Sequence, residues 1–120
     1  MFTRKIAEFA IETPSSTVPD EAIVAAGHGV IDTLGCALAG VVEPVAEIAA
    51  RWARENGGRG GVTVWGHNTE TSAADAAFAN AIAAHALDFD DSHPSARGHA
   101  SASVVPTVIA AGQAAGASGR

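Results

Sequence analysis

The sequence predicts an all-α fold with about five helices and one short extended segment. Apolar residues recur at spacings of three, four and seven through most of the chain, as they do on the buried face of a helix. Alanine, the residue with the strongest intrinsic preference for helix, is dense from about residue 73 to Leu87. Only residues 62–66, VTVWG, alternate between glycines in the manner of a strand.

Five stretches have helical periodicity and end at proline, glycine or polar breaks. They cover residues 3–12, 20–39, 44–56, about 73–87 and about 101–117. Asp20 directly follows Pro19 and favours a helix N-terminus through its interaction with the helix dipole. Thr71 or Ser72 is expected to cap the fourth helix. Pro106 lies early in the fifth, where a kink or a late start is tolerated.

The second and fourth helices are expected to pack closely against neighbours. Gly27, Gly29 and Gly35 each cost about 1 kcal/mol in a helix interior relative to alanine, so close approach of another helix is the expected compensation. The alanine-dense fourth helix suits a central position, surrounded on several sides. The VTVWG segment needs a strand partner from a distant part of the fold, or else is an extended crossing.

Charge and composition exclude several classes of protein. Hydrophobic residues make up 48% of the 120 residues and charged residues 17%, which is the range of globular domains. Seven basic residues stand against thirteen acidic ones, and the net charge is −6. Because Lys and Arg do not cluster, a nucleic-acid partner is not expected.

The chain reads as a cytoplasmic protein. The lone Cys36 lies in an apolar run, so no disulfide forms within the chain and a buried, inert thiol is expected. The N-terminus carries charges and lacks the pattern of a signal peptide. Charges or histidines interrupt every apolar run before the ~18 residues that cross a bilayer, so no membrane association is expected.

The most polar interval, HALDFDDSHPSARGH at residues 85–99, is expected to form a loop between the last two helices. A solvated acidic loop is the simplest interpretation. However, Asp88, Asp90 and Asp91 repel one another unless a cation or hydrogen-bond donors compensate. His93 and His99 flank these acids, and histidine is well suited to moving protons near neutral pH. Phe89 is expected to be a buried anchor that orients its neighbours. The segment is therefore a candidate active site.

A metal site is the alternative interpretation. His85, Asp88, Asp91 and His93 offer a mixed nitrogen and oxygen ligand set for Zn²⁺, Mn²⁺ or Fe²⁺. His85 and Asp88 are three residues apart and face the same way on a helix. The chain contains no HExxH, paired CxxC or EF-hand pattern. On this interpretation the chain is a small helical metal-binding or interaction module.

Several segments together resemble the MmgE/PrpD family, which includes 2-methylcitrate dehydratase, cis-aconitate decarboxylase and iminodisuccinate epimerase. AIVAAGHGVIDTLGCALAG is similar to an early helix of the family, and VTVWG to its short glycine-terminated strand. The run from Asn80 to Ser92 is similar to the family signature Asn-x-x-x-x-His-x-Leu-Asp-Phe-Asp-Asp-Thr. His99-Ala100-Ser101 then stands where the family has His-Pro-Ser.

The resemblance implies a cofactor-independent lyase or isomerase acting on short di- or tricarboxylic acids. Such enzymes move a proton next to a carboxylate and expel water or carbon dioxide, or invert a stereocentre. It also implies a homodimer in the full-length form, built from a large helical domain and a smaller α/β lid. Residues 1–120 correspond to the first part of the helical domain. The resemblance therefore implies an N-terminal fragment that is inactive by itself.

Position within the signature assigns a role to each candidate residue. The resemblance implies that His99 transfers a proton or positions the substrate, and that Asp88 orients a donor or acts as an acid/base partner. Ser92, where threonine is more common, is expected to hydrogen-bond a substrate carboxylate. Asp91 is expected to fix the loop and assist substrate binding. A polycarboxylate also needs cations, which in the family come from later sequence, because this segment offers only Arg97 and histidines.

Overall fold

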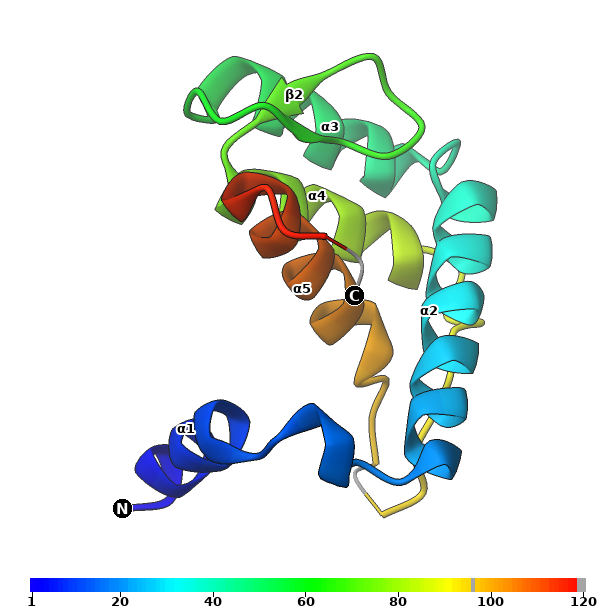
Figure 1. The fold of residues 1–120 in the computed structure, drawn as a ribbon. Coiled ribbons are helices and arrows are strands. Elements are labelled where there is room, and N and C mark those ends of the chain that lie inside the picture. Colours follow the sequence, from blue (N-terminus) through cyan, green and yellow to red (C-terminus); the bar gives the residue numbers. More distant parts are fainter. Residues whose placement is uncertain (96, 119–120) are drawn as a thin grey trace.

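The computed structural model describes residues 1–95 and 97–118, and most of these residues are helical (Figure 1). The described elements are α1 (Phe2–Glu12), the 3-10 helix η1 (Ser15–Thr17), α2 (Asp20–Gly40), α3 (Pro44–Asn56), β1 (Val62–Thr63), β2 (Glu70–Thr71), α4 (Ala73–His85) and α5 (Ser101–Ala115). The all-α prediction is confirmed. The predicted starts of α2, α3 and α5 agree with the structure to the residue.

Helix α4 occupies the centre of the fold, as its alanine content predicted. It contacts α2, α3 and α5, and α5 runs beside it (Figure 1). Its buried residues are small: Ala76, Ala79, Asn80, Ala83 and Ala84. Because small side chains let helix axes approach closely, the core is built mainly from backbone and methyl contacts.

Ser72 caps α4, which selects one of the two predicted capping residues. Its hydroxyl oxygen accepts a hydrogen bond from the Asp75 backbone N–H at 3.2 Å. Thr71 has a different role: its side chain is buried and donates toward the backbone carbonyls of Ala53 and Gly58. The cap thus fixes the start of the helix that carries His85 at its other end.

The prediction of a distant partner for VTVWG is wrong, because β2 follows only seven residues after β1. The two strands pair antiparallel, with Val62 opposite Thr71. Gly66 has a left-handed φ of 73° that lets the chain turn back. Asn80 of α4 then holds the hairpin, accepting from the Trp65 N–H at 2.8 Å and donating to the Thr63 carbonyl at 3.1 Å.

The glycines of α2 have different surroundings. A Cβ on Gly29 would lie 3.2 Å from the Ser101 hydroxyl of α5, and one on Gly40 would meet the Ala83 carbonyl of α4. Close approach is therefore confirmed for Gly29. Gly27 and Gly35 have open space beside them, so the prediction is wrong for these two.

Helix α2 is long and apolar enough, by length and composition alone, to cross a membrane. Its 21 residues include an 18-residue window with a mean hydropathy of 1.5, contrary to the expectation that charges and histidines interrupt every such run. A core helix of a soluble protein passes the same test. Cys36 on this helix is buried as predicted, and burial raises the pKa of its thiol, which keeps the thiol protonated.

Candidate active site

The site begins where α4 ends and the chain reverses. His85 is the last residue of α4, and the Asp88 N–H donates to the His85 carbonyl at 3.1 Å. Asp88 has a left-handed φ of 51°, a conformation that aspartate tolerates better than most residues with a side chain. The turn carries the next residues back toward His85. Non-glycine residues in this conformation are concentrated at functional sites.

Asp90 is the buried residue of the loop. Its side chain is fully buried, whereas the side chain of Asp88 is 80% exposed. Asp90 Oδ1 lies 2.8 Å from His85 Nδ1, which is a hydrogen bond. His99 Nδ1 lies 3.1 Å from the backbone carbonyl of Asp90 and 3.3 Å from its Oδ2. Both imidazoles therefore contact the same residue through the same ring nitrogen.

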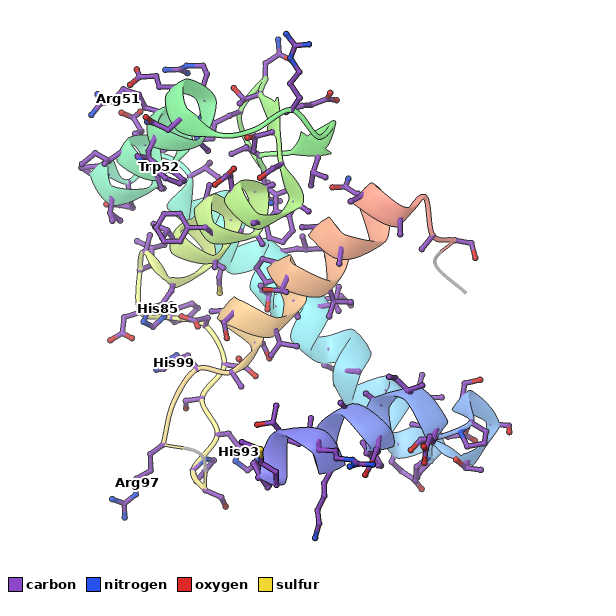
Figure 2. All side chains as sticks on the ribbon, turned by 90° about the vertical axis from the view of Figure 1, so that its left-hand side faces the viewer. Arg51, Trp52, His85, His93, Arg97 and His99 are labelled. Carbon is purple, nitrogen blue, oxygen red and sulfur yellow. The ribbon has the colours of Figure 1, made fainter. Side chains whose placement is uncertain are left out.

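The two histidines lie side by side, although they come from opposite ends of the loop (Figure 2). Their ring centroids are 4.8 Å apart, and the planes are tilted by 60°. Because the Nδ1 atoms face Asp90, the Nε2 atoms face the other way. His85 Nε2 lies 3.8 Å and His99 Nε2 3.6 Å from Asp88 Oδ1. We call His85, Asp90 and His99 the His–Asp–His cluster. Asp88 is exposed and lies on its open side.

The carboxylates favour the charged form of His85. The hydrogen bond to Asp90 is the main cause that raises the pKa of the His85 imidazole, and the charges of Asp90 and Asp88 add to it. Partial burial acts in the opposite direction. His85 consequently holds its proton to a higher pH than a free imidazole does. A group that carries an exchangeable proton near neutral pH can act as a general acid.

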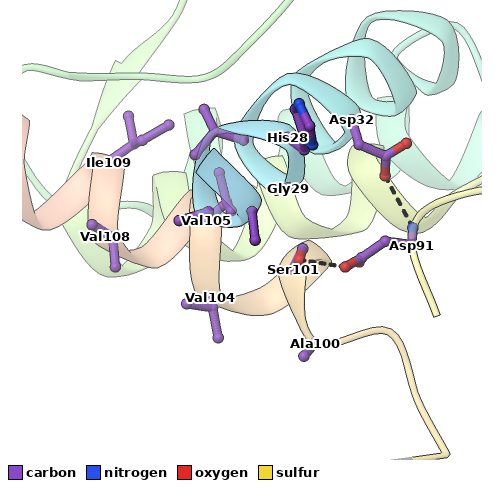
Figure 3. Close-up of a pocket in the computed structure, with 13 residues that line it drawn as sticks. His28, Gly29, Asp32, Asp91, Ala100, Ser101, Val104, Val105, Val108 and Ile109 are labelled. Atoms are coloured by element: carbon purple, nitrogen blue, oxygen red, sulfur yellow. Dashed lines mark hydrogen bonds between the residues drawn. The ribbon is translucent and has the colours of Figure 1, made fainter. Parts of the chain in front are cut away.

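Asp91 points away from this cluster and joins two helices. Its backbone N–H donates to Asp32 Oδ2 of α2 at 3.0 Å, and its Oδ2 accepts from the Ser101 hydroxyl of α5 at 2.7 Å (Figure 3). These contacts hold the loop. The proposed part of Asp91 in substrate binding stays a prediction. Asp91 also borders an apolar groove of about 710 Å³ between α2 and α5, which Gly29 and Val105 help to line (Figure 3).

The remaining loop residues lie outside the cluster. Ser92 is exposed beside Asp91, and its role as a carboxylate donor stays a prediction. The expectation that Phe89 anchors the loop is wrong, because its side chain is 82% exposed and the neighbouring Asp90 is buried instead. His93 pairs through its backbone with Gly98, and Figure 2 shows it near the far end of the loop with Arg97.

The metal ligand set predicted from the sequence is not assembled. The side chain of Asp91 bonds to Ser101, and His93 lies away from His85 and His99 (Figure 2). Within residues 1–95 and 97–118, the group with suitable ligand atoms is instead His85, Asp90 and His99, whose atoms lie within 4.8 Å of one another. A cation bound between those atoms would replace the hydrogen bonds of both rings to Asp90. The arrangement is better suited to holding and moving protons.

Sequence reasoning missed Asp90 and gave His85 only a metal-binding role. The available signal was a histidine in the last turn of a helix followed by three aspartates. That pattern does not show which aspartate turns inward. The left-handed backbone of Asp88 decides it, and its neighbours give no local indication of that conformation.

The sequence profile of the "MmgE/PrpD N-terminal domain" matches residues 4–120. Among curated proteins, the chain is 33% identical over 97 residues to cis-aconitate decarboxylase of Homo sapiens, covering 79% of this chain and 20% of that protein. It is 27% identical over 111 residues to cis-aconitate decarboxylase-like protein oryM of Aspergillus oryzae, covering 92% of this chain and 23% of the relative.

The matched residues include every element described above except the first two residues of α1, and they include His85, Asp90 and His99. The chain spans about a fifth of the length of the two curated relatives. The profile covers nearly the whole of the present sequence. The chain therefore belongs to the MmgE/PrpD family and carries the N-terminal domain of that family.

Proposed function

We propose that the protein carrying this chain is an MmgE/PrpD-type lyase or isomerase of short di- or tricarboxylic acids. It works by acid/base proton transfer without a cofactor, and the segment from His85 to His99 forms one wall of its active site. The observation that carries the proposal is the pair of imidazoles held on buried Asp90 and opening toward Asp88. The family membership and the names of the two relatives support the same reaction class.

His99 is proposed to transfer the proton. Its Nε2 faces the open side of the cluster and lies 3.6 Å from Asp88 Oδ1, so a substrate carbon placed there is within reach of both groups. When carbon dioxide leaves a substrate, the electron pair of the broken C–C bond remains on carbon and needs a proton. A protonated imidazole supplies that proton, and a neutral one removes a proton in the dehydration or epimerisation reactions.

The carboxylates of the substrate are proposed to be held by a hydroxyl group of this loop and by cations from elsewhere in the protein. Ser92 would donate a hydrogen bond to a substrate carboxylate, and Asp91 would keep the loop in place for this contact. The acidic loop itself repels a polycarboxylate, so the cations that bind it are proposed to come from the remainder of the protein. Because both relatives are named for cis-aconitate decarboxylation, cis-aconitate is the first substrate to test.

A substrate panel tests the proposal directly. The full-length protein is incubated with cis-aconitate, citrate and 2-methylcitrate, and products are identified by NMR together with release of carbon dioxide. His99→Gln is expected to lower turnover at least ~10²-fold, because general acid–base groups contribute roughly 10²–10⁴-fold. His93→Gln, a histidine on the same loop but outside the cluster, is the matched control and should keep normal turnover. Near-normal turnover by His99→Gln would remove His99 from the mechanism.

A further inference from the structure

We infer that Asp90 is a positioning residue that sets His85 and His99 in the same tautomer and presents both Nε2 atoms to the substrate. The inference rests on the proposed function, because it explains how the two rings become an acid/base pair. The sequence pattern assigns no role to Asp90. Three features of the structure carry the inference: burial, hydrogen-bond direction and an unsatisfied oxygen.

Burial distinguishes Asp90 from the acids beside it. Its side chain has no exposed surface, so water does not solvate the charge and the two imidazoles are its immediate polar neighbours. A carboxylate buried in this way persists only when nearby donors or positive charge compensate for the lost hydration. Here the compensation comes from one ring on α4 and one ring just before α5. Asp90 therefore connects two histidines that the chain separates by thirteen intervening residues.

Hydrogen-bond direction fixes the proton on each neutral ring. Both partners of the Nδ1 atoms, the Asp90 carboxylate and the Asp90 carbonyl, are acceptors at 2.8 Å and 3.1 Å. Each Nδ1 must therefore carry a hydrogen. In a neutral imidazole the other nitrogen is then unprotonated, so both Nε2 atoms are free to accept a proton. Carboxylates orient the histidines of catalytic triads in the same way.

The second carboxylate oxygen indicates that Asp90 is more than a packing residue. Within the described residues, Asp90 Oδ2 is buried and receives no hydrogen bond, although it lies 3.3 Å from His99 Nδ1. Buried carboxylate oxygens usually accept hydrogen bonds, so the position of this one beside an imidazole needs a specific explanation. The oxygen instead faces the ring of His99, where its charge stabilises the imidazolium that proton transfer creates.

NMR of the unmodified full-length protein tests the tautomers of His85 and His99 directly. With ¹⁵N-labelled histidine, long-range proton–nitrogen correlations distinguish a ring protonated at Nδ1 from one protonated at Nε2. His85→Gln and His99→Gln variants assign the signals. Above the pH at which the rings lose their charge, both are expected in the Nδ1–H form. Finding either ring mainly in the Nε2–H form would overturn the inference.

Asp90→Asn tests the consequence for catalysis, because it keeps the shape of the side chain and removes the charge. The amide oxygen can still accept from His85, and the backbone carbonyl of residue 90 can still accept from His99, so the variant mainly removes the buried negative charge beside both rings. The expected result is a fall of about 10–100-fold in kcat with little change in KM. Because the hydrogen bond to Asp90 is the main cause that raises the pKa of His85, the pH at which His85 loses its proton should also move lower in this variant, which shifts that limb of the pH–rate profile.

Controls separate this inference from the proposed function. Asp20→Asn removes an exposed acid at the start of α2 and should change neither kcat nor the pH profile. Near-UV circular dichroism and thermal unfolding report whether Asp90→Asn is folded. A folded Asp90→Asn variant with an unchanged kcat and pH profile would overturn the inference while leaving the lyase or isomerase activity intact. Nδ1–H rings in a folded protein that turns over none of the acids would instead contradict the proposed function.

Discussion

Three of the four residues from 88 to 91 are aspartates, and each lies in a different environment. Asp88 is exposed and takes the left-handed backbone that reverses the chain. Asp90 is buried between two imidazoles, and Asp91 joins α2 to α5. The repulsion among these acids is reduced by hydrogen-bond donors: His85 contacts Asp90, and the Ser101 hydroxyl donates to Asp91. The sequence predicted that either such donors or a cation would be needed. The same residue type thus performs a conformational, an electrostatic and a structural task within one turn of chain.

The raised pKa of His85 predicts a pH-dependent contribution to stability. Because the pKa is higher in the folded than in the unfolded state, the contribution is fully present below the ordinary histidine pKa of about 6.5. It is lost as the pH rises through the folded pKa. His85→Gln should therefore unfold more easily than the unmodified protein below pH ~6.5, and the difference should shrink as the pH rises. Chemical unfolding across this range measures it, and a pH-independent difference would contradict the prediction.

The sequence predicted a polar loop between two helices but not the geometry within that loop. The placement of an acidic, histidine-containing loop between two helices was predictable, because the Ser72 cap and the alanine content define α4 and the apolar periodicity defines α5. The pairing of His85 with His99 was not, because it depends on the backbone of Asp88 and on contacts between distant parts of the chain. Local pattern identifies which residue types are available. It does not determine which of them turn inward.

At the scale of elements, helix boundaries were predictable and strand pairing was not. Proline, acidic first turns and the Ser72 cap mark the ends of helices through local interactions. The hairpin has only two paired residues in each described strand. The side-chain amide of Asn80 adds hydrogen bonds to the backbone of Thr63 and Trp65. Asn80 also opens the signature that leads to His85. Its contacts here show that this signature asparagine has a structural task.

Two glycines of α2 give a matched test of helix packing. Gly40→Ala should destabilise the protein by about 1–3 kcal/mol, because the new methyl group would overlap the Ala83 carbonyl of α4. Gly35→Ala meets open space and should stabilise α2 by up to about 1 kcal/mol. Urea unfolding followed by far-UV circular dichroism measures both. Equal effects of the two substitutions would show that close approach at Gly40 does not govern this interface.

The whole molecule buries its small apolar residues and exposes its large ones. Among residues 1–95 and 97–118, eleven of the fifteen buried hydrophobic residues are alanine, whereas Ile31 and Leu38 of α2 and Val108 of α5 are 71%, 67% and 63% exposed. Helix α1 buries no residue and stands apart from the other helices (Figure 1). The radius of gyration of 15.0 Å exceeds the ~14 Å typical of a compact domain of this length.

These exposed faces predict that residues 1–120, prepared alone, self-associate or remain partly molten. Large apolar side chains exposed along two helices are unfavourable in water and are usually covered in stable proteins. The expected results are a sedimentation value above that of a monomer, or weak near-UV circular dichroism with dye binding. A monomeric sedimentation value together with sharp aromatic dichroism would contradict this prediction.

The contacts of Asp91 also have a mechanical consequence. Asp91 borders the groove between α2 and α5, bonds to both helices and is joined by one peptide bond to the residue that holds the two imidazoles. A change in the spacing of α2 and α5 would therefore move Asp91 and, through one peptide bond, the contacts of Asp90 with His85 and His99. The groove and the pair of imidazoles are thus linked through the single peptide bond between Asp90 and Asp91.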